Sequence, residues 1–157
     1  MNIRKACIKD LKDILALNFA LFKKEHKDYD KSFNLKWTYS KGKKHFTDKI
    51  IERNSFVEVA EWKGKIVGYL CGGVSIGRFS REKAKYAELH NMFVLDEFRS
   101  KGIGTKLAKD FISWCKKKKI KYIAVTASAK NNLGINFYRK LGFKDYNLTL
   151  QIINKKG

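Results

Sequence analysis

The sequence predicts a single α/β domain built on a mixed β-sheet. Short apolar runs typical of strands alternate along the chain with segments of helical periodicity. The strand–helix–strand order over residues 86–127 requires a crossover, which makes those two strands parallel and their connection right-handed. A length of 157 residues and an apolar content of 44% fit one domain with its own core. Residues 1–157 are therefore expected to form one unit.

The N-terminal third predicts a strand followed by a helix. Residues 2–8 fit a short strand, and Asp10 is expected to cap the next element. Apolar residues at helical spacing predict an amphipathic helix over residues 11–22. Residues 23–49 are polar with scattered aromatic residues, which fits short helices around a variable loop.

The rest of the chain predicts a hairpin and then alternating strands and helices. Residues 56–62 and 65–76 form the hairpin around a Lys-Gly turn. The elements that follow are a basic loop over residues 77–85, a strand over 86–95, a polar connection over 96–102, a helix from 103 that lysines 116–119 close, a strand over 121–127, a helix over 132–140 and a last strand over 148–153.

The charge balance is strongly basic. Lys and Arg number 35 against 15 Asp and Glu, which gives a net charge of +20. Such a field attracts polyanions, whether nucleic acid, anionic membrane or a phosphorylated ligand, although the lysines are spread along the chain rather than gathered in one segment. No run approaches the roughly 18 apolar residues of a membrane span, and the N-terminus does not resemble a signal peptide.

The cysteine and histidine pattern predicts neither a disulfide framework nor a metal site. Cys7, Cys71 and Cys115 are odd in number and far apart, as expected of a reduced cytoplasmic protein, and all three are interpreted as core residues. His26 and His45 lie in lysine-rich stretches and are expected to be solvated. No metal is expected, because no His, Cys, Asp or Glu cluster has ligand spacing in the sequence.

The segment from Val94 to Thr105 is typical of a phosphate site. A strand runs into a glycine-bearing turn, and a helix starts directly after it. Backbone N–H groups at a helix start lack partners and lie at the positive end of the helix dipole. Gly102 and Gly104 allow a ligand to approach the backbone, and Arg99 and Lys101 add positive charge, so the segment suits a pyrophosphate. The Walker pattern and the dinucleotide pattern GxGxxG are both absent.

Two motifs carry a resemblance to a known family. Arg99-x-x-Gly102-x-Gly104 after a hydrophobic strand resembles the acetyl-CoA signature [RQ]xxGx[GA] of the GNAT superfamily of N-acyltransferases. Downstream, Asn131-x-x-Gly134-Ile135-x-Phe137-Tyr138-x-x-Leu141-Gly142-Phe143 is similar to that superfamily's NxxAxxFYxxxGF element, with Gly134 where alanine is usual. The resemblance covers residues 55–153 well. It implies a mostly antiparallel sheet with a splayed parallel strand pair and helices on both faces.

The resemblance also implies roles for individual residues. The amides of Ser100, Lys101, Gly102, Ile103, Gly104 and Thr105 would hold the CoA pyrophosphate, with Arg99 beside them. The backbone at Phe93 and Val94 would pair with the pantetheine arm, which enters the gap between the splayed strands. Asn131 matches the family's cofactor-facing asparagine, and Tyr138 matches the tyrosine that protonates the departing thiolate.

Two residues are candidates for the base that the reaction needs. Glu88 and His90 lie two apart on the strand leading to Val94, so without a bulge both point the same way. Both stand where members of the family carry a base, and an imidazole suits proton transfer near neutral pH. A water chain is the third route to deprotonate the amine.

The sequence thus predicts an acetyl-CoA-dependent N-acetyltransferase that works by direct transfer in a ternary complex. The acceptor is a primary amine: a protein N-terminus, a lysine of an acidic protein, or an amine on a phosphorylated small molecule, because a +20 surface disfavours free polyamines and aminoglycosides. The alternative is a basic module that docks on nucleic acid and keeps CoA as a passive ligand. Self-association into a homodimer is left open.

Overall fold

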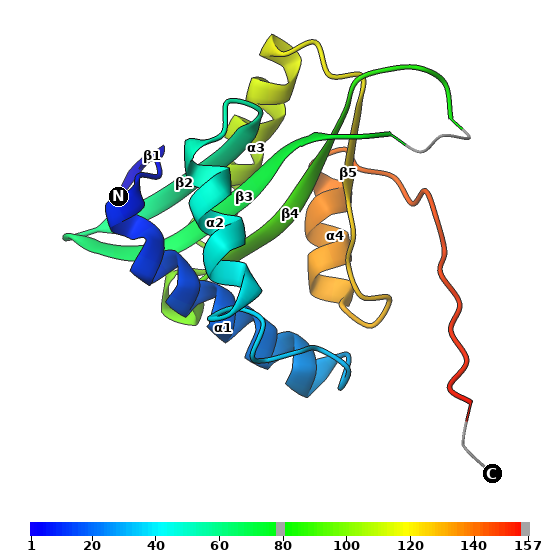
Figure 1. The fold of residues 1–157 in the computed structure, drawn as a ribbon, viewed down its shortest axis with the longest axis horizontal. Coiled ribbons are helices and arrows are strands. Elements are labelled where there is room, and N and C mark those ends of the chain that lie inside the picture. Colours follow the sequence, from blue (N-terminus) through cyan, green and yellow to red (C-terminus); the bar gives the residue numbers. More distant parts are fainter. Residues whose placement is uncertain (78–80, 155–157) are drawn as a thin grey trace.

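A five-stranded sheet with the strand order β1-β2-β3-β4-β5 organises the fold in the computed structural model, which describes residues 1–77 and 81–154 (Figure 1). Neighbouring strands are antiparallel except β4 and β5, which are parallel. The elements in chain order are β1 (Asn2–Lys5), η1 (Ile8–Asp10), α1 (Leu11–Asp28), α2 (Lys41–Ile51), β2 (Ser55–Trp62), β3 (Lys65–Ser75), β4 (Tyr86–Val94), η2 (Asp96–Phe98), α3 (Ile103–Lys117), β5 (Tyr122–Val125) and α4 (Asn132–Lys140). The predicted mixed, mostly antiparallel sheet is confirmed.

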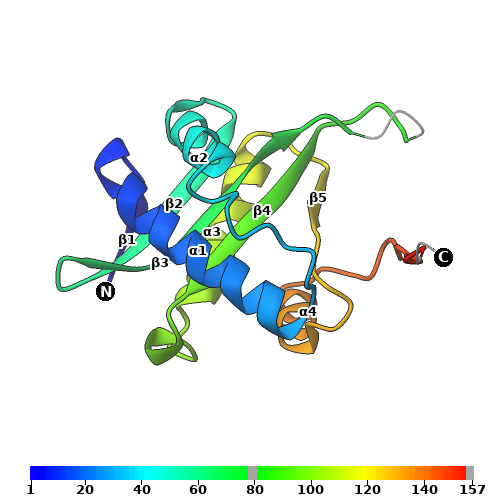
Figure 2. The same cartoon turned by 60° about the horizontal axis from the view of Figure 1, so that its bottom comes forward.

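Helices cover both faces of the sheet, as predicted (Figure 2). On one face, α1 and α2 pack over the first three strands in a cluster that includes Ile14, Phe46 and Tyr69. On the other face, α3 contributes Leu107 and Phe111 to a second cluster, against which α4 packs its aromatic side. Alternation along the strands assigns successive side chains to the two clusters, so every central strand is buried on both sides. No helix among the described residues is long and apolar enough to cross a membrane.

The predicted last strand is wrong. Residues 144–154 follow α4 without regular secondary structure, and their large apolar residues are exposed, with Leu150 at 85%. The segment leads away from the sheet (Figure 1). Alternating apolar residues favour a strand, but a strand also needs a neighbour to pair its backbone, and these residues pair with none of the described strands.

Other boundaries differ by a few residues. The helix predicted over 11–22 continues to Asp28, and its polar last turn carries a Lys24–Asp28 ion pair of 2.7 Å. The first strand ends at Lys5, and Cys7 after it is exposed rather than a core residue, whereas Cys71 and Cys115 are buried as predicted. Of the predicted basic loop, residues 78–80 lie outside the described residues.

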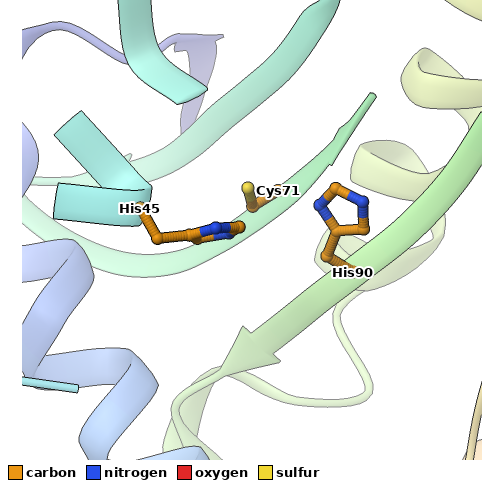
Figure 3. Close-up of side chains that lie close together, drawn as sticks. All are labelled: His45, Cys71 and His90. Carbon is orange, nitrogen blue, oxygen red and sulfur yellow. The ribbon is translucent and has the colours of Figure 1, made fainter. Parts of the chain in front are cut away.

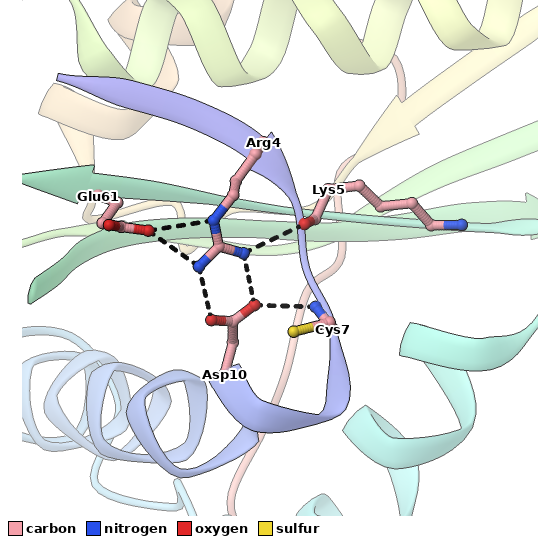
Figure 4. Close-up of polar contacts among 5 residues, drawn as sticks. All are labelled: Arg4, Lys5, Cys7, Asp10 and Glu61. Carbon is pink, nitrogen blue, oxygen red and sulfur yellow. Dashed lines mark hydrogen bonds and ion pairs between the residues drawn. The ribbon is translucent and has the colours of Figure 1, made fainter. Parts of the chain in front are cut away.

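Arg4 connects β1 to the elements on either side of it (Figure 4). Its guanidinium donates to both oxygens of Asp10, at 2.8 and 2.9 Å, and to Glu61 Oε2 on β2 at 2.9 Å. The Asp10 carboxylate also accepts the backbone N–H of Cys7 at 2.8 Å. Asp10 does occupy the N-cap position of α1, but its side chain makes no capping bond there, because Arg4 and Cys7 engage it instead.

This network makes stability depend on the charge of Asp10. The carboxyl is 5% exposed, and the hydrogen bonds from Arg4 lower its pKa from 3.8 to about 2. A lowered pKa contributes stability that is complete above the unfolded value of 3.8 and is lost as the pH falls through about 2.

We expect Asp10→Asn to lower the free energy of unfolding by about 2–3 kcal/mol at pH 7, since it leaves Arg4 with one carboxylate. The difference from wild type should shrink by about 1–2 kcal/mol between pH 5 and pH 2, after allowing for the solvent that reaches Arg4. Urea denaturation at a series of pH values measures both. Asp13→Asn, an exposed carboxylate of the same helix, is the matched control. A pH-independent difference would contradict the assigned role of the charge.

Candidate active site

The site begins where β4 loses its parallel neighbour. The two strands pair only from Tyr86 with Tyr122 to Leu89 with Val125, although β4 continues to Val94. A bulge in the pairing of β3 and β4 lies at this point: Gly72 pairs with Leu89 and Cys71 with Asn91, which leaves His90 as the extra residue. Beyond Leu89, the edge of β4 that faced β5 has no strand partner among the described residues.

A cavity of about 740 Å³ opens along this free edge. Its walls are the end of β4, the loop into α3, the end of β5, the aromatic side of α4 and the last turns of α1. The residues predicted to bind the cofactor that line it are Phe93, Val94, Arg99, Ser100, Gly102, Ile103, Gly104, Thr105, Asn131 and Tyr138. Residues from positions 93 to 138 therefore meet in one place.

The loop before α3 presents backbone amides to this cavity. Gly102 is the N-cap of α3 with φ +77°, and Ser100 has φ +59°, so the chain turns tightly into the helix. The first N–H groups of α3 have no partner within the helix and lie at its positive end. A Cβ at Gly104 would lie 3.6 Å from Phe137 and 3.8 Å from Met92, which are ordinary contacts. The fold therefore tolerates a Cβ at 104, so contacts within the protein do not require a glycine at this position.

Arg99 is held in place by the protein itself. Its Nε donates to the carbonyl of Val94 at 2.8 Å, its Nη1 lies 2.8 Å from Asp96, and its guanidinium lies 5.1 Å from the centre of the Phe93 ring. These contacts fix the loop against the end of β4. Lys101 behaves differently: its amine donates to the carbonyl of Glu97 at 3.0 Å, and the residue is not part of the cavity wall.

These features agree with the comparison of the sequence with known families. Residues 15–143 match the model of the acetyltransferase (GNAT) family. The chain belongs to this family. It is 32% identical over 147 residues to an uncharacterized N-acetyltransferase, MJ1207, of Methanocaldococcus jannaschii, covering 92% of this chain and 61% of that protein. The chain therefore spans about three fifths of that relative's length.

Solved structures share the GNAT fold. A mutant form of the BH1408 protein from Bacillus halodurans aligns with a TM-score of 0.87 and 20% identity, covering 99% of this chain and all of that one. The aminoglycoside N-acetyltransferase AAC(6')-Iy in complex with CoA aligns with a TM-score of 0.73 and 15% identity, over 99% of this chain and all of that one. At such identities these likenesses establish the fold alone.

Asn131 has a structural task at the start of α4. Its Oδ1 accepts the N–H of Gly134 at 2.9 Å and caps the helix. The side chain folds so closely over Gly134 that a Cβ there would lie 2.7 Å from Asn131 Nδ2. An alanine at this position, usual in GNAT proteins, would require the Asn131 side chain to shift from the place it has in this chain.

Tyr138 lies on the cavity wall with its hydroxyl protonated. Its ring packs edge-on against Phe137 and Phe143, at centroid distances of 5.1 and 5.7 Å. Burial, with a smaller contribution from the Glu25 charge, raises the pKa of Tyr138 to about 12. A phenol in this state can donate a proton to a developing anion.

The two predicted bases are placed differently. His90 lines the cavity, is half-buried, and has a pKa lowered by burial and by the positive charge of Lys49. Glu88 lies between Ala87 and Leu89, whose side chains belong to the cluster on the α3 face, so its own side chain projects from the opposite face. Glu88 does not line the cavity.

Glu25 on α1 is a cavity residue that the sequence reasoning missed. It is half-buried, and burial raises its pKa. It lies one turn after Leu21, which also lines the cavity, so continuation of the apolar stripe of α1 was the available signal.

The expectations for two histidines are also corrected. His26 is half-buried, with its Nδ1 3.3 Å from the carbonyl of Phe33. His45 is half-buried on α2 among the rings of Trp37, Phe46 and His90. The structure brings His45 and His90 together with Cys71, so the absence of ligand spacing in the sequence does not exclude a metal site.

Proposed function

We propose that the protein is an N-acetyltransferase that transfers the acetyl group of acetyl-CoA directly to a primary amine. One observation carries the proposal. The unpaired edge of β4, the amide-bearing start of α3 and Tyr138 border a single cavity. An extended ligand with a pyrophosphate at one end and a reactive thioester at the other fits that order of features.

The chain offers matching groups for each part of acetyl-CoA. Amides of residues 100–105 suit the pyrophosphate, because they lie at a helix start and Gly104 leaves the approach clear. The free edge of β4 at Phe93 and Val94 suits the amide groups of the pantetheine arm, as an exposed strand accepts an extended partner. Acetyl-CoA supplies the activated acyl group when bound.

His90 and Tyr138 then divide the proton transfers. His90 accepts the proton of the attacking amine, because it lines the cavity and burial keeps its ring neutral. As the new C–N bond forms and the C–S bond breaks, Tyr138 gives its proton to the departing sulfur. A backbone N–H at the free edge of β4 stabilises the oxyanion. The acceptor nitrogen loses its second proton as the amide forms, and this proton restores the one that Tyr138 gave to the sulfur, while the proton on His90 goes to solvent.

The acceptor is a cationic amine recognised at the end of α1. Glu25 and Asp30 line the cavity there. The neighbouring Lys24 is paired with Asp28 at 2.7 Å, so two carboxylates are available locally despite the net charge of +20. An ammonium group is attracted to this wall and loses its proton to His90 on binding. Because these carboxylates lie at the cavity, the net positive charge of the chain does not exclude polycationic acceptors.

The first test concerns the pyrophosphate cradle. Gly104→Val should weaken CoA binding by at least about tenfold, because its side chain would obstruct the approach of the phosphates to the amides, whereas a Cβ at 104 makes only ordinary contacts within the protein. Isothermal titration calorimetry measures the affinity, and circular dichroism verifies the fold. Lys101→Ala, which removes a charge outside the cavity wall and keeps the amide, should bind within a few-fold of wild type. If the Gly104 variant bound CoA as tightly as wild type, the assignment of the amides of residues 100–105 to the pyrophosphate would be refuted.

The second test concerns the general acid. Tyr138→Phe removes one oxygen and little volume, so CoA affinity should stay within a few-fold. Turnover at saturating acetyl-CoA should drop by at least tenfold, or about 1.4 kcal/mol of barrier. The rate of thiol release with an amine identified by screening measures the effect. If turnover is undiminished, Tyr138 is not the general acid and serves only in packing.

The third test separates the two candidate bases. His90→Gln should lower turnover by about 10²-fold or more at fixed pH, as removal of a general base does. Glu88→Gln, outside the cavity wall, should change turnover by less than about threefold. Acetyl-CoA binding in both variants serves as the control for folding. The opposite order would assign the role to Glu88, and two unaffected variants would favour a water chain.

A further inference from the structure

We propose that His45, Cys71 and His90 form a binding site for a thiophilic transition-metal ion, with Zn²⁺ as its representative. The three residues come from α2, β3 and β4, and their ligand atoms all lie within 4.8 Å of one another. Figure 3 shows the Cys71 sulfur near both rings, with the three side chains turned toward a common space. The three residues are 19 or more apart in sequence, and only the fold brings them together.

A buried nitrogen atom without a hydrogen-bond partner indicates that a ligand binds beside His90. Nδ1 of His90 is buried and makes no hydrogen bond to any described residue. Leaving a buried nitrogen unpartnered is unfavourable, so such an atom calls for a bound species. Its nearest aromatic neighbour is the His45 ring, at a centroid distance of 5.9 Å, and that ring also offers nitrogen lone pairs.

The ligand types select the metal class. One sulfur and two imidazole nitrogens suit Zn²⁺ and similar ions, whereas Mg²⁺ and Ca²⁺ require oxygen ligands. Tetrahedral zinc, with bonds of about 2.0–2.3 Å, separates such ligands by about 3.3–3.6 Å. The three ligand atoms, which lie within 4.8 Å of one another, must therefore approach by about one ångström or less to bind a single ion. Three protein ligands leave a fourth position for water.

The protonation states favour binding at neutral pH by the two imidazoles. Burial lowers the pKa of both His45 and His90, so their lone pairs are available. The Cys71 thiol is fully buried with a pKa raised to about 12, so it is protonated until a metal displaces its proton. Zinc uptake by this site therefore releases one proton from Cys71.

The surrounding charges permit a cation. The charges that act on the three ligands are those of Lys49, Glu52 and Asp48. Lys49 opposes a metal, but its amine is paired with Glu52 Oε2 at 3.0 Å. The Cys71 thiolate formed on binding adds a full negative charge next to the ion.

A metal at this site acts on the reaction through His90. This step rests on the proposed function, whereas the metal site itself does not. An imidazole whose lone pair coordinates zinc cannot accept the proton of the amine, so occupancy should inhibit acetyl transfer. The site is thus proposed as an inhibitory one.

Direct metal binding tests the proposal without any assay of activity. The purified full chain, freed of metal with a chelator, is titrated with Zn²⁺ in the absence of CoA, whose thiol would compete. We expect one zinc per chain, about one proton released in weakly buffered solution, and a thiolate charge-transfer band when Co²⁺ replaces Zn²⁺.

Variants locate the site. Cys71→Ser and His45→Gln should each weaken zinc binding by at least about tenfold and abolish or reduce the cobalt band. Cys115→Ser and His26→Gln, a second buried cysteine and a half-buried histidine elsewhere, are matched controls that should bind as wild type does. If Cys71→Ser fails to fold, zinc binding by His45→Gln alone tests the site. Absence of saturable binding, or binding that survives in a folded variant of either ligand, overturns the proposal.

A last measurement separates this proposal from the proposed function. If the chain transfers acetyl groups, zinc should inhibit wild type at the concentrations at which it binds, and should inhibit His45→Gln at least about tenfold more weakly. Zinc binding in a chain that transfers no acetyl group refutes the proposed function and leaves the metal site standing. Acetyl transfer by a chain that binds no zinc refutes the metal site and leaves the proposed function standing.

Discussion

The constraint on which the site depends is that β4 cannot pair its backbone on both sides along its whole length. It pairs with β3 up to Val94, but with β5 only as far as Leu89. The bulge at His90 falls where the second pairing ends, and it changes which residues face each cluster: Leu89 and Met92 contact the same one, three residues apart. A regular strand would place them on opposite faces. The bulge therefore shifts the register of the strand after His90, at the point where the pairing with β5 ends.

Arg99 fixes the second part of the site relative to the first. The carbonyl of Val94 ends the free edge of β4, and the guanidinium that binds it belongs to the loop before α3. Since the same side chain pairs with Asp96, the loop cannot shift along β4 without breaking several contacts. Arg99 thus holds the loop against the end of β4. The distance between the amides and the strand edge is set before any ligand arrives.

Sequence reasoning succeeded where the signal is local. The strand, the glycine turn and the helix start of residues 94–105 are contiguous, and so is the run from Asn131 to Tyr138, so spacing alone describes them. It failed where the outcome depends on a distant partner. Glu25, in the site, and His45, beside Cys71, reach their places only through packing of α1 and α2 on the sheet. Residues 148–153 have the pattern of a strand, but pattern does not supply a neighbouring edge.

The charge distribution serves the two substrates of the proposed reaction in different ways. A net charge of +20 attracts a donor that carries phosphates from any direction, because a summed field acts over the whole surface. The proposed amine acceptor would be repelled by that same field, and the carboxylates of the cavity wall that could attract it are Glu25 and Asp30. Glu25 is half-buried, so salt screens its attraction for the amine less than it screens the surface field. Raising the ionic strength therefore weakens the capture of the donor more than the recognition of the acceptor. The extension of α1 to Asp28, which sequence periodicity underestimated, is what brings Glu25 to the cavity.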